Sequence, residues 1–187
     1  MARKKSKSAH KEKPVLLTTL LVVAEGEDDR AFIGHMKELF FQRRKGYKGP
    51  KIESADGGSP HDILKAAAKL LNNRDYDHRI VVMDSDEPVK SQDRKAAEQK
   101  GFKIIQWSPQ CLEGALLDVL GQRVNPHESS QKLKARLHPQ LADHHTKPEA
   151  YAVKFPRPVL EHHNNTSVKE VRNVLEGREP NDDGENG

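Results

Sequence analysis

The stretch VLLTTLLVVAEGEDD, residues 15–29, decides the fold class. Its first ten residues are apolar or β-branched without polar alternation, which is typical of a strand covered on both faces, as in a parallel sheet. RIVVMD, residues 79–84, predicts a second such strand, and residues 51–54 and 102–107 predict two more. Four strands of this kind favour one central, mostly parallel sheet.

The segments between the predicted strands have helical patterns. Residues 28–41 carry apolar side chains at helical spacing, and Ser59 followed by Pro60 is a suitable N-cap and first residue for another helix. The predicted helices span residues 28–41, 60–71, 91–100, 111–120, 130–137 and 167–175. Strands that alternate with helices predict an α/β, Rossmann-like domain with a small helical C-terminal extension.

Charge divides the chain of 187 residues into a core and two polar ends. Residues 2–13 contain six basic side chains and one acidic side chain, whereas residues 176–187 contain five acidic side chains and one basic side chain. We therefore expect a disordered basic arm and a disordered acidic tail around one domain and its extension. The predicted boundaries are 1–13, 14–121, 122–176 and 177–187. A basic arm indicates a polyanionic partner or serves solubility alone.

The single cysteine, Cys111, excludes a disulfide framework and a paired-cysteine zinc site. We expect it to be a small buried side chain. The lysine-rich start followed by residues 15–24 imitates a signal peptide, but that run ends in acidic residues and not in a small-residue cleavage site. No apolar run reaches the roughly 18 residues that span a bilayer. We expect a cytoplasmic protein without a membrane partner.

Acidic residues follow the predicted strands at their carboxyl ends, where open α/β sheets bind ligands. Glu25 and Asp29 follow the first strand, Asp84 and Asp86 close the strand at 79–84, and Glu113 comes after the last strand. Carboxylates that converge on one sheet edge repel each other unless cations lie among them, and oxygen ligands favour Mg²⁺ or Mn²⁺ over Zn²⁺. The sequence therefore predicts a metal site formed by these five residues.

Glu113 carries independent information because it shares a helical stripe with Leu116, Leu117 and Leu120. A carboxylate that faces a core must find a partner or lose its charge. We expect that partner to be a metal ion or an arginine.

Several short motifs together resemble a known family. They are EGEDD at 25–29, GGSP at 57–60, DSDE at 84–87, and Pro109 followed by Glu113. The combination resembles the Toprim domain, and within that group the RloB-like proteins and the OLD-type nucleases. The resemblance covers roughly residues 15–121.

This resemblance implies a Toprim fold and Mg²⁺- or Mn²⁺-dependent cleavage of DNA or RNA in phage defence or restriction, often beside an ABC-type ATPase. It implies that Glu25, Asp84 and Asp86 are catalytic metal ligands, and that Asp29 and Glu113 are additional ligands.

The resemblance extends loosely to YAVK at 151–154, where Lys154 corresponds to a lysine in the site of OLD-type enzymes. Lys154, or failing that a loop arginine, is expected to neutralise charge on the phosphate. One departure from the family pattern is that Gly114 and Ala115 follow Glu113, where an aromatic residue is expected.

Other polar groups are open to two interpretations. The loop residues Arg43, Arg44, Lys45 and Lys48 are either contacts for a nucleic-acid backbone or a solvated charged run. The histidine pairs 144–145 and 162–163 are expected to be polar surface, because neighbouring side chains point apart and one pair does not readily chelate one ion. Trp107 is expected to pack in the core, with base stacking as the alternative.

Alternative functions remain beside the nuclease. One is a non-cleaving Toprim module that binds metal and nucleic acid and acts with an ATPase, and another is an RNA-processing Toprim ribonuclease. A haloacid-dehalogenase-like phosphatase is disfavoured because Asp84 and Asp86 follow a later strand and not the first. A response-regulator receiver is disfavoured because no clear Lys-Pro follows Ser108.

Overall fold

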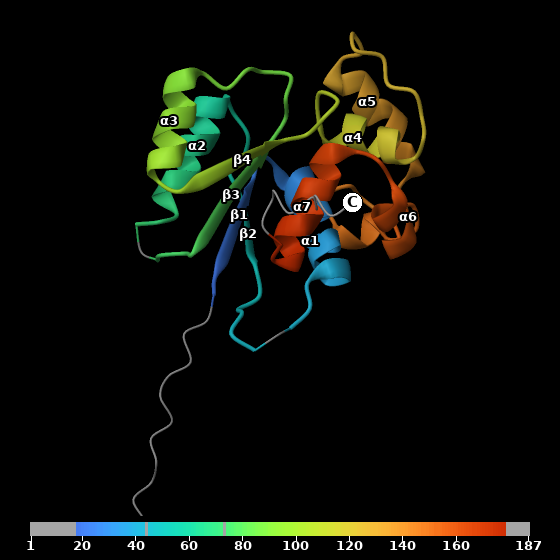
Figure 1. Ribbon diagram of the computed structural model, residues 1–187. Helices are drawn as coiled ribbons and strands as arrows, with labels where there is room; N and C mark the ends of the chain where they lie inside the picture. The colour runs from blue at the N-terminus through green and yellow to red at the C-terminus, as the bar shows by residue number, and fades with distance from the viewer. Residues whose placement is uncertain (1–17, 44, 73, 179–187) are drawn as a thin grey trace, which may run out of the picture.

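The computed structural model describes residues 18–43, 45–72 and 74–178. A four-stranded, all-parallel sheet lies at its centre in the order β2-β1-β3-β4 (Figure 1). The strands are β1 (Leu20–Ala24), β2 (Lys51–Ser54), β3 (His78–Met83) and β4 (Phe102–Gln106). The predicted α/β, Rossmann-like fold class is confirmed. The predicted basic arm, and residues 179–187 of the predicted acidic tail, lie outside the described residues.

Seven α-helices and two 3₁₀ helices are found in the described part of the chain. They are α1 (Glu27–Phe40), α2 (Pro60–Lys69), α3 (Ser91–Gln99), α4 (Leu112–Val119), α5 (Ser130–Leu137), η1 (His138–Gln140), η2 (Pro148–Tyr151), α6 (Arg157–His162) and α7 (Thr166–Glu176). The Oγ atom of Ser59 accepts a hydrogen bond from the backbone N–H of Asp62, which confirms the predicted cap of α2. None of the described helices has the length and apolar character needed to cross a membrane.

Helices cover both faces of the sheet (Figure 1). Leu21 and Val23 of β1 pack in one hydrophobic cluster with residues of α2 and α3. Val22 and Ala24 of the same strand pack in the other cluster, with residues of α1, α4 and α7. This double coverage explains why β1 is apolar at every position.

Residues after Gly121 pack in the same hydrophobic cluster as Val22 and Ala24 of β1. Leu133 and Leu137 of α5, Tyr151 of η2, and Val168 of α7 are all buried in it. The extension is therefore continuous with the core that covers the α1 face of the sheet. The elements η1, η2 and α6 were not predicted because they are too short to show a helical period and contain proline.

The connections leave the two central strands in opposite directions. From β1 the chain runs through α1 to β2 at one edge, and from β3 it runs through α3 to β4 at the other. The carboxyl ends of β1 and β3 therefore form a topological switch point, which is where open α/β sheets bind ligands. Glu25 follows β1 and Asp84 follows β3 at this point.

Candidate metal centre

Glu25 and Asp84 are joined directly at the switch point. The Glu25 Oε2 atom accepts a hydrogen bond of 2.8 Å from the backbone N–H of Asp84. The Oδ1 atom of Asp84 in turn accepts one of 3.2 Å from the N–H of Leu112, the first residue of α4. Within the described residues, the second oxygen of each of these two carboxylates has no hydrogen bond. One oxygen of each thus orients the side chain, and the other is available to a ligand.

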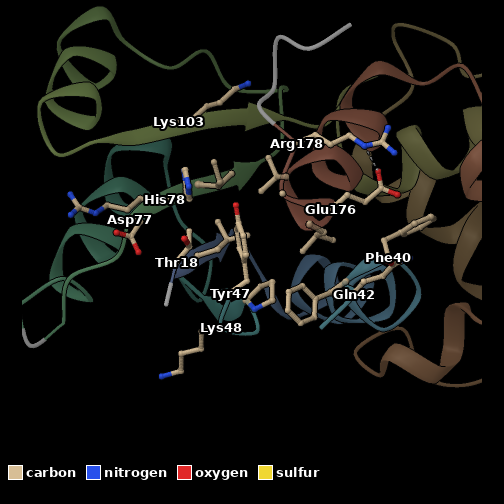
Figure 2. Close-up of a pocket in the computed structure, with 18 of the residues that line it drawn as sticks. Thr18, Phe40, Gln42, Tyr47, Lys48, Asp77, His78, Lys103, Glu176 and Arg178 are labelled. Atoms are coloured by element: carbon tan, nitrogen blue, oxygen red, sulfur yellow. Dashed lines mark ion pairs between the residues drawn. The ribbon is translucent and has the colours of Figure 1, made fainter. Parts of the chain in front are cut away.

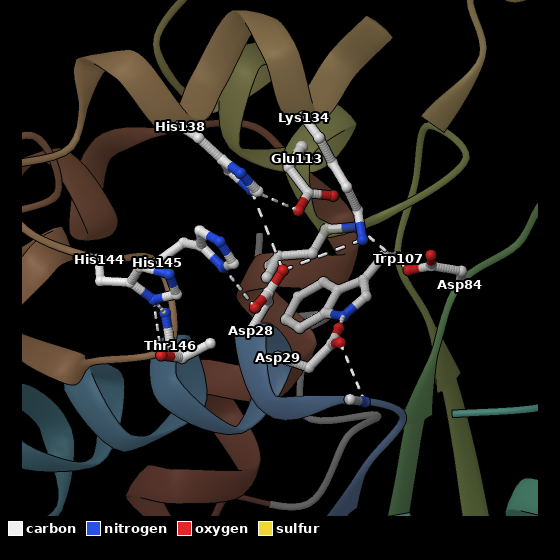
Figure 3. A network of polar contacts seen from close by, with 12 residues as sticks. Asp28, Asp29, Asp84, Trp107, Glu113, Lys134, His138, His144, His145 and Thr146 are labelled. Carbon is white, nitrogen blue, oxygen red and sulfur yellow. Dashed lines mark hydrogen bonds and ion pairs between the residues drawn. The ribbon is translucent and has the colours of Figure 1, made fainter. Parts of the chain in front are cut away.

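Asp29 lies in the first turn of α1 and is buried. The indole N–H of Trp107 donates a 2.5 Å hydrogen bond to its Oδ1 atom, and the N–H of Gly26 donates one of 3.2 Å to its Oδ2 atom (Figure 3). Trp107 follows β4 and is fully buried, so its predicted place in the core is confirmed. Cys111 is also buried, and burial raises its pKa to about 12, in accordance with its predicted structural role.

Glu113 is 2% exposed in the first turn of α4, as its place on an apolar stripe predicted. Among the described side chains its partner is His138, whose Nε2 lies 3.1 Å from Glu113 Oε1, and not an arginine. Gly114 stands where the family pattern has an aromatic residue, and steric hindrance explains why a glycine is found there. A Cβ atom on Gly114 would lie 2.1 Å from the carbonyl oxygen of Pro109, so no larger residue fits.

Burial and mutual repulsion shift the pKa values of these carboxyl groups. Burial, with the charges of Asp29, Glu25 and Glu113, raises the pKa of Asp84 to about 9. Burial also raises the pKa of Asp29 to about 7, although the hydrogen bond from Trp107 acts to lower it. The pKa of Glu25 is raised as well, mainly by burial. At neutral pH the cluster therefore holds protons that a cation could replace.

Asp86 differs from the other four predicted ligands because it is exposed. The chain bends after Asp84, and the N–H groups of Ser85 and Asp86 both donate to the carbonyl oxygen of Gln110, at 2.7 and 3.1 Å. The Asp86 carboxylate accepts a 3.2 Å hydrogen bond from Ser130 Oγ. It lies on the rim of the site, and its charge still raises the pKa of Glu25 and of Asp84.

The five predicted carboxylates do not converge on one point. Across the described residues, the only group of three metal-binding side chains with ligand atoms within 4.8 Å of one another is Asp28, His138 and His145. The structure thus brings Glu25, Asp29, Asp84 and Glu113 to one edge of the sheet, but several of their oxygens are held by N–H groups at separate positions.

Lys134 of α5 places a positive charge beside the cluster: its Nζ lies 3.9 Å from Asp28 Oδ2, and its charge acts to lower the pKa of Glu25. Partial burial acts to lower the pKa of Lys134, but the nearby charges of Glu113 and Asp28 raise it overall. Lys154, which the family resemblance favoured, lies in the exposed turn after η2. Within the described residues, Lys154 makes no hydrogen bond or ion pair with the carboxylates.

The basic loop lies at the opposite edge of the sheet. The backbone N–H of Lys48 donates to the carbonyl oxygen of Thr18, just before β1, whereas the carboxylates follow the strands. Arg43 and Lys48 line a pocket of about 530 Å³ at this amino edge (Figure 2). Lys45 is exposed, and Arg44 lies outside the described residues. The structure does not bring this loop together with the carboxylates.

Four polar residues beside the carboxylates were not predicted as site residues from the sequence: Asp28, Lys134, His138 and His145. The prediction that adjacent histidines point apart was wrong for His144 and His145, because their rings stack with centroids 4.2 Å apart. Their Nδ1 atoms still have different partners: His144 Nδ1 contacts Thr146 at 2.8 Å, and His145 Nδ1 contacts Asp28 Oδ1 at 2.6 Å (Figure 3). Only the tertiary structure brings His138 next to His145, because no periodic pattern links them.

The expectation that the histidine pairs form polar surface was wrong for His163. This side chain is 8% exposed, and burial lowers its pKa to about 4. His162, its neighbour, is exposed and contacts the carbonyl oxygen of Pro158. The pair is thus divided between the core and the surface.

No protein-family model matches this chain, and neither a curated protein nor a solved structure matches it.

Proposed function

We propose that this protein is a Mg²⁺- or Mn²⁺-dependent nuclease that cleaves phosphodiester bonds of DNA or RNA, of the Toprim kind that its motifs resemble. The observation that carries the proposal is the contact between Glu25 and Asp84. It links the Glu25 carboxylate to the backbone N–H of Asp84 at the topological switch point, and one oxygen of each of the two carboxylates is held by an N–H group. Such a pair is suited to a hard divalent cation.

The donor set fits Mg²⁺ or Mn²⁺ better than a softer metal, because Glu25, Asp84 and Asp29 offer only oxygen atoms. Buried carboxyl groups with raised pKa values are stabilised when a cation replaces the proton. Glu25 and Asp84 would hold the ion, and Asp86 on the rim, Asp29 and Glu113 would complete or support its shell.

A bound divalent ion would supply a water of lowered pKa and neutralise charge on the phosphate. The side chains of this protein perform the remaining tasks. Lys134 places a positive charge beside the acidic cluster and would stabilise the charge that develops on the phosphate, the task that the resemblance gave to Lys154. Trp107 holds Asp29 in place and fills the space behind it.

The substrate would approach the carboxyl edge of the sheet, where Asp86 and Ser130 mark the rim. Any nucleic acid bound by the basic loop at the amino edge would contact the protein away from the site of cleavage. The motif resemblance also supports a cytoplasmic role in phage defence or restriction beside an ABC-type ATPase.

The test is a cleavage assay on single- and double-stranded DNA and RNA with Mg²⁺, Mn²⁺ or EDTA. We expect metal-dependent cleavage by the wild type and a loss of at least about a hundredfold in Glu25→Gln and Asp84→Asn. Asp143→Asn, an exposed carboxylate on the loop between η1 and η2, is the matched control and should cleave like the wild type.

Cleavage by Glu25→Gln and Asp84→Asn at the wild-type rate would contradict the proposal. Nucleic-acid binding without cleavage under every metal would instead favour the non-cleaving module that acts with an ATPase.

A further inference from the structure

A second group of ligand atoms lies beside the carboxylate cluster. One carboxylate oxygen of Asp28, Nε2 of His138 and Nδ1 of His145 lie within 4.8 Å of one another. Asp28 belongs to the first turn of α1, His138 begins η1, and His145 lies in the loop before η2. Figure 3 shows the three side chains directed toward one another from these three elements.

The contacts within this group are one short hydrogen bond and one longer ion-pair contact. His145 Nδ1 lies 2.6 Å from Asp28 Oδ1, and His138 Nε2 lies 4.0 Å from Asp28 Oδ2. The same Nε2 atom lies 3.1 Å from Glu113 Oε1, so a second carboxylate borders the group. A proton between an imidazole nitrogen and a carboxylate oxygen occupies a position that a metal ion can take, with release of the proton.

The surrounding structure holds these ligands in place. The ring of His145 is stacked between those of His138 and His144, with centroid distances of 4.0 and 4.2 Å. The hydroxyl group of Tyr151 donates a 2.8 Å hydrogen bond to the backbone carbonyl of His145. Ligands that are already ordered cost little conformational entropy when a metal binds.

The group is also accessible. The side chains of Asp28, His138 and His145 are 17%, 24% and 28% exposed. A metal ion can therefore enter from solvent without opening the core.

We infer that Asp28, His138 and His145 form a Zn²⁺ site that is separate from the carboxylate centre. Two imidazole nitrogens and a carboxylate oxygen are a common Zn²⁺ donor set, whereas Mg²⁺ favours oxygen ligands alone. Three protein ligands leave the fourth position of a tetrahedral Zn²⁺ site to water. The ion joins α1 to the C-terminal extension, so its main role is to fasten the loop between η1 and η2 onto the sheet domain.

The inference is tested on the full chain after removal of metals with a chelator. Zn²⁺ affinity is measured in competition with a chromophoric chelator, and Co²⁺ is used as a spectroscopic substitute. We expect the wild type to bind one Zn²⁺, with at least about tenfold weaker binding in His145→Ala and in Asp28→Asn. Zn²⁺ should also raise the midpoint of thermal unfolding of the wild type and not that of His145→Ala.

His162 provides a matched control, because it is exposed on α6 and its Nδ1 atom contacts the backbone carbonyl of Pro158. His162→Ala should bind Zn²⁺ like the wild type. Wild-type Zn²⁺ affinity in His145→Ala, or no Zn²⁺ binding by the wild type, would overturn the inference.

The result is independent of the proposed nuclease activity. Glu25→Gln should lose cleavage and retain Zn²⁺ binding. If the wild type cleaves no nucleic acid but binds Zn²⁺ through His145, the nuclease proposal fails and the zinc site remains. Loss of Zn²⁺ binding in Glu25→Gln would show that the two sites are one and would overturn the inference.

Discussion

The indole N–H of Trp107 donates a hydrogen bond of 2.5 Å to Oδ1 of Asp29, and this contact joins the end of β4 to the first turn of α1. It places the only tryptophan of the chain next to Asp29 of the acidic cluster (Figure 3). The bond stabilises the ionised carboxylate, whereas burial opposes ionisation. Trp107 therefore helps to set the charge of the cluster as well as its shape.

Trp107→Phe removes this donor and retains an aromatic ring. We expect the pKa of Asp29 to rise above its value of about 7, and the unfolding free energy at pH 8 to fall by about 1–3 kcal/mol, because a hydrogen bond to a charged group is lost. The pKa is measured by NMR titration of the Asp29 carboxyl carbon. An unchanged Asp29 pKa in Trp107→Phe would show that the bond has no electrostatic role.

The stability of the metal-free protein should fall as pH rises. Asp84 has a pKa of about 9 in the folded protein and 3.8 as its ordinary value, so the folded state binds the proton more tightly. The stabilisation from this protonated group is complete below about pH 4 and is lost progressively up to about pH 9. The slope approaches about −1.4 kcal/mol per pH unit for each such proton.

Asp84→Asn should make that slope shallower between pH 7 and 9, measured by urea unfolding in EDTA. Asp143→Asn is the control, because the pKa of Asp143 is lowered and the group is ionised throughout this range. A slope in Asp84→Asn that equals that of the wild type would contradict the assignment of a raised pKa to Asp84.

The sheet and most of the helices could be predicted from the sequence alone. Double coverage leaves a strand such as β1 without polar positions, and Ser59 with Pro60 marks a helix start that the structure retains. These signals are local, so they can be read from a few neighbouring residues. The short elements η1, η2 and α6 have no such signal.

The candidate site could be predicted only in part. Glu25 and Asp84 follow strands, and strand ends in a parallel sheet meet at a common edge. Lys134 and His138 come from the extension, whose position depends on tertiary packing against α1 and α4. The basic loop was linked to nucleic acid by charge alone, and charge does not tell at which edge of a sheet a loop lies.

Lys134 and Lys154 offer a direct comparison of a structural and a sequence-based assignment. We expect Lys134→Met to lower the metal-dependent cleavage rate by at least about tenfold, because its charge lies beside the cluster. Lys154→Met should cleave at close to the wild-type rate, because Lys154 is exposed in a turn. Single-turnover kinetics measure both, and a larger loss in Lys154→Met than in Lys134→Met would restore the sequence-based assignment.

Gly114→Ala should destabilise the protein, because the new Cβ atom would lie 2.1 Å from the backbone oxygen of Pro109. We expect a loss of about 1–3 kcal/mol in the unfolding free energy, measured by urea denaturation. Gly49→Ala is the control, since a Cβ there would lie 3.7 Å from the ring of Phe41, an ordinary contact. Equal stability of the two variants would contradict this account of the α4 start.

The central claim is that the carboxylates at the ends of β1 and β3 bind a hard divalent cation. Mn²⁺ binding at pH 8, followed by the electron paramagnetic resonance signal of the free ion, tests it most directly, in a His145→Ala background that removes the proposed zinc site. We predict that Glu25→Gln and Asp84→Asn each weaken Mn²⁺ binding by at least about tenfold, and that Asp143→Asn does not. Unchanged Mn²⁺ affinity in Asp84→Asn would contradict the claim.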